Sequence, residues 1–233
     1  MKVALLFSGH LRSFQKCLPF IQENLLNTLE PDCFMFTWTQ MGINKFIDVH
    51  LTTSNIYPML GLINSVLKPK AMESQKQQVL NADRYKAKLI DKRSPSGVLT
   101  MFYSIFKANE IFKKYCKDNN CEYDVVIRLR PDLKFKSPIT KEHLSVINDN
   151  NSIYIPSFGN YSGINDQFAI GTPEAMDKYS KTFINFDRLT NQAEFLPESL
   201  LKQNCINERL EINQVDFIKY SILRVNGEEI TQT

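Results

Sequence analysis

The stretch YDVVIRLRPDLKF, residues 123–135, places charged side chains at a regular spacing. Arg128, Arg130, Asp132 and Lys134 fall on every second residue, so an extended chain points all four to one side. Two neighbouring guanidiniums match phosphate oxygens, and a carboxylate beside a diphosphate is the usual way of holding a divalent cation. The pattern predicts a site for a phosphorylated ligand. The alternative is an internal ion pair of Asp132 with Arg128 or Arg130 on a solvated edge strand.

A buried strand would carry these charges to one edge of a sheet. Val125, Ile127 and Leu129 alternate with them, which predicts a strand over residues 123–130. Pro131 lacks the N–H that a regular ladder needs, so pairing is expected to stop there.

Apolar runs and helical stripes alternate along the chain, and this alternation predicts the fold class. The continuous run Val3–Phe7 predicts a strand covered on both faces, a stripe from Leu18 to Leu29 predicts a helix, and Cys33–Trp38 predicts a second strand. Strand, helix, strand opens an α/β fold with parallel strands, and we expect residues 1–233 to form one domain. The further expected elements are a strand near 45–51, a helix near 55–67, a solvated basic stretch at 75–95, a helix capped by Ser94 or Ser96 and ending near 117, a short helix after 136, a strand at 153–156, a loop at 157–166, a strand from 166 to 171, helices near 173–185 and 196–206, and short strands near 209–224.

Composition excludes several classes of protein. A net charge of +3 is too small for a dedicated nucleic-acid binder, so no nucleic-acid partner is expected. No apolar run approaches the ~18 residues of a membrane span, and the N-terminal run is too short for a signal peptide. Five cysteines without a CxxC pair favour a reducing compartment, which predicts a cytoplasmic protein.

Known motifs for other chemistries are missing from the sequence. It contains no GxxxxGK[ST] motif, which excludes a P-loop. It also contains neither the GxGxxG of dinucleotide-binding sites nor the GxSxG of serine hydrolases, which argues against both classes. The three histidines, at positions 10, 50 and 143, lie far apart without zinc-ligand spacing.

Ligands of open α/β sheets bind outside the carboxyl ends of the strands. The first predicted strand ends in Ser8-Gly9, where a glycine lets the backbone approach a ligand, and the cation Arg12 follows. The second ends in Thr37-Trp38, and we assign Thr37 to the same ligand site. The alternatives are a plain turn at Gly9 with an exposed Arg12, and a Trp38 that belongs to the core.

The ordered set of motifs resembles small nucleotide-sugar glycosyltransferases with a GT-A-type fold, of the kind found in bacterial surface-polysaccharide clusters and in large DNA viruses. YDVVIRLRPDLKF resembles their R-x-R-x-D segment, ALLFSGHLRSF their first strand and nucleotide-binding turn, SGVLTMFYSIFKANEIF the helix before that segment, and NDQFAIGTPEAMDKY the acceptor-side stretch. Order and spacing match across most of residues 2–205. The resemblance implies an α/β, Rossmann-type sheet that is mixed, mainly parallel and flanked by helices.

The resemblance also implies roles for individual residues. Ser8, Gly9 and Arg12 would hold the nucleotide, Arg128 and Arg130 would face the diphosphate, and Asp132 would stand in for the metal-binding carboxylate of a D-x-D motif. Mn²⁺ or Mg²⁺ would be the cofactor, a nucleoside-diphosphate sugar the donor, and a glycan hydroxyl the acceptor. Arg130 stands where D-x-D has its first Asp, so the arginines would replace part of the metal's work.

An inverting transfer needs a base for the acceptor hydroxyl. Asp166 is our candidate because it follows a glycine-bearing loop and precedes an apolar strand; Glu194 and Glu198 are in reserve, and the alternative for Asp166 is a turn residue. Three rival functions stay open at this point: a non-catalytic nucleotide- or glycan-binding module with a degenerate metal site, a nucleotidyltransferase that makes the activated sugar, and a basic nucleic-acid binder.

Overall fold

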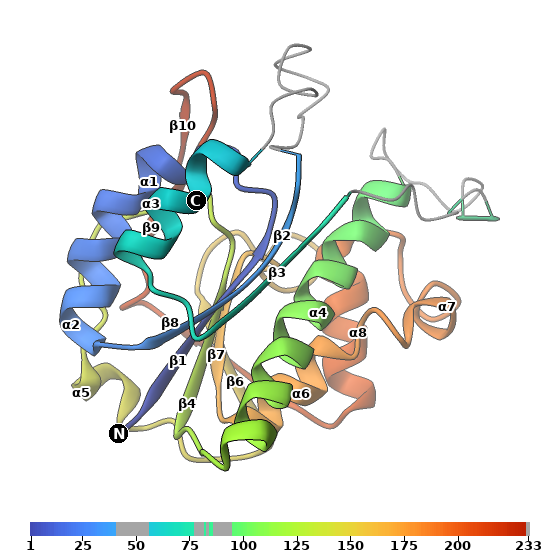
Figure 1. The fold of residues 1–233 in the computed structure, drawn as a ribbon. Coiled ribbons are helices and arrows are strands. Elements are labelled where there is room, and N and C mark those ends of the chain that lie inside the picture. The colour runs from blue at the N-terminus through green and yellow to red at the C-terminus, as the bar shows by residue number, and fades with distance from the viewer. Residues whose placement is uncertain (41–55, 77–81, 83, 86–94, 232–233) are drawn as a thin grey trace.

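The computed structural model describes residues 1–40, 56–76, 82, 84–85 and 95–231. Seven of the described strands form one mixed sheet in the order β3-β2-β1-β4-β7-β6-β8 (Figure 1). Only β7 runs against its two neighbours; every other pair in this sheet is parallel. The bounds are β1 (Val3–Gly9), β2 (Asp32–Trp38), β3 (Ala71–Gln75), β4 (Val125–Leu129), β6 (Ser152–Pro156), β7 (Phe168–Gly171) and β8 (Glu211–Val215).

Helices cover both faces of this sheet, which confirms the predicted α/β class with a mainly parallel sheet. On one face lie α1 (Phe14–Ile21), a π-helical turn η1 (Gln22–Leu26), α2 (Asn27–Leu29), α3 (Tyr57–Val66) and α5 (Lys141–Leu144). On the other lie α4 (Pro95–Asn119), α6 (Pro173–Ser180), α7 (Phe186–Leu189) and α8 (Pro197–Asn207) (Figure 1).

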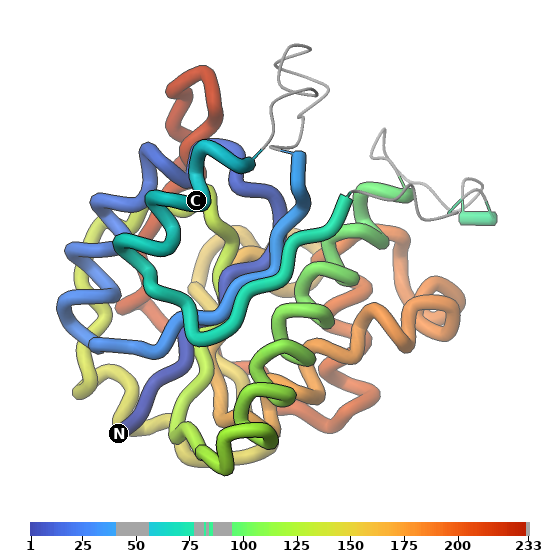
Figure 2. Tube along the Cα trace, in the orientation of Figure 1, coloured from blue at the N-terminus to red at the C-terminus, as the bar shows by residue number. Residues whose placement is uncertain are grey.

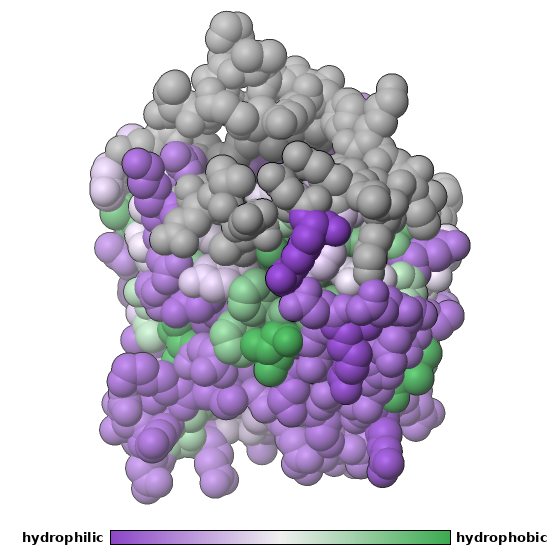
Figure 3. Space-filling view, turned by 90° about the vertical axis from the view of Figure 1, so that its right-hand side faces the viewer, coloured by the Kyte–Doolittle hydropathy of each residue, from purple (hydrophilic) through white to green (hydrophobic). Residues whose placement is uncertain are grey.

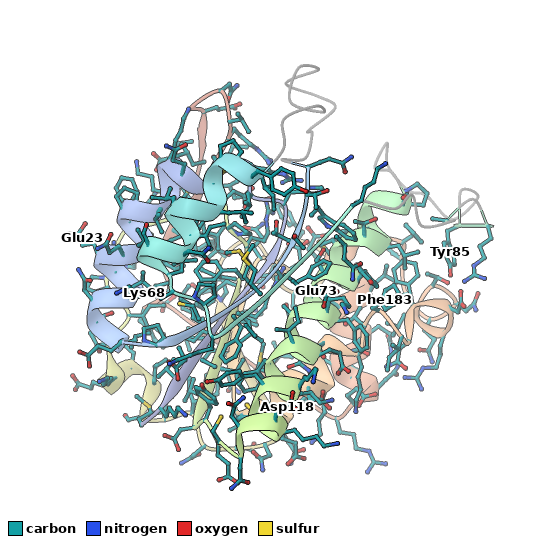
Figure 4. All side chains as sticks on the ribbon, in the orientation of Figure 1. Glu23, Lys68, Glu73, Tyr85, Asp118 and Phe183 are labelled. Atoms are coloured by element: carbon teal, nitrogen blue, oxygen red, sulfur yellow. The ribbon has the colours of Figure 1, made fainter. Side chains whose placement is uncertain are left out.

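Two apolar cores separate the sheet from these helix layers. In β1, Val3, Leu5 and Phe7 point into the core under α1, while Ala4 and Leu6 point into the core under α4. The continuous apolar run at the N-terminus therefore reflects a strand buried on both faces, as predicted. Among the labelled side chains of Figure 4, Glu23 and Lys68 lie on the side of the first helix layer, and Glu73 and Phe183 lie towards α4.

A small second sheet packs beside α1 and carries the C-terminal end of the described chain. Its order is β10-β9-β5, and all of its pairs are antiparallel. The bounds are β5 (Leu133–Phe135), β9 (Tyr220–Leu223) and β10 (Glu229–Ile230). The Leu223 N–H donates to the carbonyl of Asp132 at 3.1 Å, so the β9–β10 hairpin is fixed to the end of the charged stretch.

Three details of the fold differ from what the sequence suggested. β4 lies between β1 and β7 with every residue buried, as predicted, so the solvated edge strand of the alternative interpretation is absent at this stretch. The β3 strand was not predicted, because Ala-Met-Glu-Ser-Gln has no apolar alternation and forms a strand only by pairing with β2. Ser96 lies inside α4 rather than capping it. The other cap candidate, Ser94, the strand expected near 45–51 and most of the basic stretch at 75–95 lie outside the described residues.

Within the described part of the chain, no helix has both the length and the apolar character to cross a bilayer. On the side of the molecule that carries α4, most of the coloured surface is hydrophilic, with green near the centre and in smaller areas towards both edges (Figure 3).

Candidate functional site

The three predicted strand ends meet at one edge of the sheet. β1, β2 and β4 are parallel neighbours, with Gly9 beside Thr37 and Phe7 beside Leu129 in the register. The first strand, dark blue in Figure 2, runs side by side with the yellow-green β4. The topology therefore brings Ser8, Gly9, Thr37 and Arg128 to the same carboxyl edge, as the sequence predicted.

Arg128 is a buried cation at this edge. Its side chain is 2% exposed, its Nε donates to the Ser8 hydroxyl at 2.7 Å, and its Nη1 donates to the carbonyl of Asp166. No described carboxylate lies within ion-pair distance of it, although the charge of Asp166 acts on it from farther away. Burial lowers the pKa of the Arg128 guanidinium below its ordinary value, yet an arginine stays charged in a protein. The site holds a positive charge whose nearest partners are neutral oxygens.

Arg130 and Asp132 form a bidentate ion pair. The Nε and Nη2 of Arg130 donate to the two carboxylate oxygens of Asp132 at 2.9 and 2.6 Å. The Nη1 of Arg12 donates to the same carboxylate at 3.4 Å. Burial alone would raise the pKa of Asp132, but the guanidiniums of Arg130 and Arg12 outweigh it and hold that pKa below its usual range. The Arg130–Asp132 pairing that the sequence left as the alternative is therefore present, on a central strand end.

Arg224 is a fourth guanidinium of this edge that the sequence analysis missed. It begins the turn between β9 and β10, directly after Leu223, whose N–H is bound to Asp132. Its charge acts on both Arg130 and Asp132. The hairpin signal Asn226-Gly227 behind a short strand marks the turn, but only the pairing of β9 with β5 shows where the turn lies.

The site carries more positive than negative charge. The guanidiniums of Arg12, Arg128, Arg130 and Arg224 face the carboxylates of Asp132 and Asp166, and the charge of Glu228 acts on Arg224, so positive charge remains in excess. Burial lowers the pKa of Arg12 and of Arg224, as it does that of Arg128. The Nε atoms of Arg12 and Arg224 are buried and donate to no acceptor in the described part of the chain. This is the electrostatic environment of an anion site.

The loop between β6 and β7 places Asp166 at the same edge. Asn165 is fully buried, and its side-chain oxygen accepts from the N–H groups of Gln167 and Phe168 and from the hydroxyl of Tyr220 at 2.9–3.1 Å. Asp166 is 7% exposed, and its carboxylate makes no hydrogen bond or ion pair with another described residue. The structure brings Asp166 next to Arg128, since its carbonyl is a partner of that guanidinium.

Gly9 and His10 shape the turn after β1. Gly9 has φ +117°, in a region that side-chain-bearing residues rarely adopt, so the glycine is required by the backbone. The Nδ1 of His10 lies 3.1 Å from the carbonyl of Gln40, so Nδ1 carries the proton and Nε2 its lone pair. Burial, aided by Arg12, lowers the pKa of His10 to about 4, which keeps the ring neutral.

Thr37 and Trp38 are buried too deeply to contact a ligand directly. Both are essentially unexposed, and the indole N–H of Trp38 donates to Ser104 at 3.0 Å within the core under α4. Trp38 is a core residue, which was the alternative interpretation of its sequence position. The predicted ligand role of Thr37 rests on its position beside Gly9 alone. Of the reserve carboxylates, Glu194 is exposed, and Glu198 is buried at the start of α8, where its carbonyl accepts from Ile164.

The described residues around Asp132 do not fit a divalent cation. Both carboxylate oxygens already accept from guanidiniums, and three cations act on Asp132. Mn²⁺ and Mg²⁺ need several oxygen ligands and would be repelled by the arginines. The described residues also contain no group of three or more His, Cys, Asp or Glu side chains arranged for a metal ion.

Comparisons with known proteins give a fold and a family. Among solved structures, the chain is similar to the glycosyltransferase GlyE of Streptococcus pneumoniae TIGR4, with a TM-score of 0.50 and 9% identity, over 93% of this chain and 46% of that one. The apo form of GlyE matches with a TM-score of 0.48, 9% identity, and 92% and 45% coverage. The chain thus spans under half the length of these proteins. The likeness at a TM-score of 0.50 shows a glycosyltransferase-like fold alone.

No curated protein matches the sequence. A family model described as "Domain of unknown function (DUF7796)" matches residues 1–221, which is nearly the whole chain. The chain belongs to the DUF7796 family of domains.

Proposed function

We propose that this protein transfers a sugar from a nucleoside-diphosphate sugar to a hydroxyl group of a glycan. The observation that carries the proposal is Arg128, a buried guanidinium at the carboxyl edge of the sheet whose direct partners are a hydroxyl and a carbonyl. A buried cation without a carboxylate partner favours an anionic ligand. The excess positive charge of the edge suits the negative charge of a diphosphate.

The arginines would act mainly on the leaving group. When the bond to the sugar breaks, negative charge builds up on the outer phosphate, and donors already in place lower the energy of that state. Arg128 is held by Ser8 and by the Asp166 carbonyl, and Arg130 is held by Asp132. Because these guanidiniums are fixed before the ligand binds, little reorganisation is needed during the reaction.

Asp132 would serve as a positioning residue in this scheme. It accepts from Arg130 and Arg12 and lies beside Arg224, so it gathers cations that would otherwise repel one another. The metal role that the D-x-D resemblance implied would fall to the guanidiniums instead. We therefore expect donor binding that does not require Mn²⁺ or Mg²⁺ at Asp132.

Asp166 would be the base that accepts the proton of the attacking hydroxyl in an inverting displacement. Its carboxylate makes no hydrogen bond within the described chain, while its backbone is fixed to Arg128. Inversion requires the base and the leaving group on opposite sides of the anomeric carbon, so the Asp166 carboxylate would have to face the acceptor while its carbonyl holds Arg128. Ser8, Gly9 and Arg12 would surround the nucleotide part of the donor, and the buried Thr37 would support Gly9 from the neighbouring strand.

The competing function is a nucleotide- or glycan-binding module without catalysis. It uses the same arginines, so binding of a nucleotide alone does not separate the two. Release of the free nucleoside diphosphate from a donor does, because only a transferase breaks the bond to the sugar.

The test is nucleotide release from UDP-, GDP- and dTDP-sugars and from CMP-sugars, with EDTA and with Mn²⁺. Arg128→Lys keeps the charge but loses the fork geometry, and we expect about a 10²–10³-fold lower rate. Arg209→Lys is the matched control, because Arg209 is exposed after α8 at the opposite edge. Arg12→Gln is a second variant, since its side chain is 26% exposed and its bond to Asp132 is long, so the fold should tolerate the change. If both site variants released nucleotide at the wild-type rate, the diphosphate role of these arginines would be refuted.

A further inference from the structure

The loop between β6 and β7 presents one aromatic ring to solvent. Residues 160–163 form a turn closed by the Gly163 N–H, which donates to the carbonyl of Asn160 at 2.8 Å. Tyr161 is the first central residue of that turn. Its side chain is 71% exposed, the highest value among the large apolar residues of the described chain. It makes no hydrogen bond or ring contact with another described residue.

The backbone at Tyr161 is unfavourable for a tyrosine. Its φ is +43°, in the left-handed region, and a turn with positive φ at this position favours glycine or asparagine. Neither the backbone nor the packing of the described chain requires an aromatic side chain here. The ring itself is the feature that the packing of the fold does not explain.

The turn is also held rigidly. The Asn160 side chain accepts from the Asn165 N–H at 2.9 Å and donates to the Pro156 carbonyl at 3.1 Å. A Cβ on Gly163 would overlap the backbone of Glu198 and Ser199, so the turn lies directly on the start of α8. Tyr161 is therefore presented from a fixed base rather than from a loose loop.

The position of the turn connects it to the proposed reaction. β6 runs parallel to β8 and antiparallel to β7, so the loop that follows Pro156 lies at the carboxyl edge, where Arg128 is bound by Asp166. Asp166 follows Tyr161 by five residues, and Asn165 contacts both Asn160 and the Tyr220 hydroxyl. The exposed ring and the candidate base thus share one hydrogen-bonded loop.

We propose that Tyr161 is the stacking platform for a sugar ring of the acceptor glycan. The flat C–H face of a pyranose packs against an aromatic face, and a tyrosine offers a rigid ring with few rotatable bonds. The inference rests on the proposed glycosyl transfer, and it adds an acceptor subsite that is separate from the arginine cluster. No arginine of that cluster contributes to it.

The test separates the ring from the fold and from the donor site. Tyr161→Gly removes the ring and suits the left-handed backbone, Tyr161→Asn does the same with a side chain, and Tyr161→Phe keeps the ring. For each protein we would measure the melting temperature, nucleotide release without acceptor, and the KM for transfer to the methyl glycosides of glucose, galactose, mannose and N-acetylglucosamine. Direct binding of these probes would be followed by saturation-transfer NMR.

We expect the Gly and Asn variants to melt at or above the wild-type temperature and to release nucleotide from the donor at the wild-type rate. Their KM for the acceptor should rise by about tenfold or more, while Tyr161→Phe stays within about twofold. Equal KM values in wild type and Tyr161→Gly, or no binding of any probe to the wild type, would overturn the inference. Nucleotide release by the wild type would then still support the transferase. A wild type that releases no nucleotide would instead refute the proposed function.

Discussion

Replacing Asp132 by Asn tests how the arginine cluster is held together. The substitution keeps the shape of the side chain but removes the charge, and it turns an N–H₂ group towards guanidiniums that also only donate. Asp132 is 1% exposed and accepts from Arg130 at 2.9 and 2.6 Å and from Arg12 at 3.4 Å. The variant leaves Arg12, Arg130 and Arg224 close together without their common counter-charge.

The expected loss of stability is substantial. Removing one partner of a buried ion pair costs about 3–5 kcal/mol. The side chains of Arg130 and Arg12 are 16% and 26% exposed, so water reaches them in part and the lower end, about 3 kcal/mol, applies. For a chain of this length, 1 kcal/mol moves the melting temperature by about 2–4 °C, which predicts a decrease of roughly 6–12 °C.

The assay is thermal unfolding in a phosphate-free buffer near pH 7. Asp118→Asn is the matched control, since its ion pair with Lys114 is well exposed and should be worth less than about 1 kcal/mol. Phosphate, compared with chloride at equal ionic strength, should restore part of the lost melting temperature in Asp132→Asn by replacing the missing anion. A variant that melts within about 2 °C of the wild type, or that gains nothing from phosphate, would contradict the reasoning.

The pH dependence of the same variant follows from the lowered pKa of Asp132. A carboxyl whose pKa is depressed in the folded state stabilises the fold above its unfolded pKa, about 3.9, and this contribution is lost as the pH falls through the lower folded value. The wild type should therefore lose its advantage over Asp132→Asn below about pH 4, and the two melting curves should converge there.

Three further predictions concern the edges of the site. Gly163→Ala should destabilise the fold by about 2 kcal/mol or more, measured by denaturant unfolding, because its Cβ would overlap the backbone at the start of α8; an unchanged midpoint would show that the loop lies elsewhere. Gly9→Ala should lower the free energy of unfolding by about 1–3 kcal/mol, because alanine is strained at φ +117°, and it should also weaken nucleotide binding. The control Gly227→Ala, at an exposed residue that also has a positive φ, should lower stability without affecting nucleotide binding. The pKa of His10 is lowered to about 4, so the fold favours the neutral ring. The free energy of unfolding should therefore fall by at most about 3 kcal/mol as the pH drops from 6.5 to 4. His10→Gln should lack this pH dependence when the melting temperature is measured across the same range.

The periodic parts of the fold were predictable from the sequence, and the parts that depend on pairing were not. The run at Val3–Phe7 and the wide stripe of α4 carry their own signals, since burial on two faces or one shows in apolar spacing. β3 carries no such signal, because its polar residues become a strand only when β2 offers an edge. The antiparallel direction of β7 likewise follows from how the chain returns, not from its composition.

The candidate site also has a part that was predictable from the sequence and a part that was not. Ser8 and Arg128 were predicted at one edge because parallel strands bring their carboxyl ends together, and the structure joins them by a hydrogen bond. Arg224 lies about ninety residues further on, and only the pairing of β9 with β5 brings it to Asp132. The partner of Asp132 could not be read from its spacing, because an alternating pattern serves a ligand and an ion pair equally well.

Binding of free nucleoside diphosphates to the wild-type protein, measured by calorimetry with EDTA and with Mn²⁺, tests most directly whether the arginine edge is a diphosphate site. We predict that one nucleoside diphosphate binds with micromolar affinity in EDTA, that Mn²⁺ changes the affinity by less than about threefold, and that Arg128→Lys weakens binding by about tenfold or more. Binding that appears only with Mn²⁺ would instead support Asp132 as a metal ligand. No binding of UDP, GDP or dTDP under either condition would contradict the account, and the four guanidiniums would then be an ion-pair cluster within the fold.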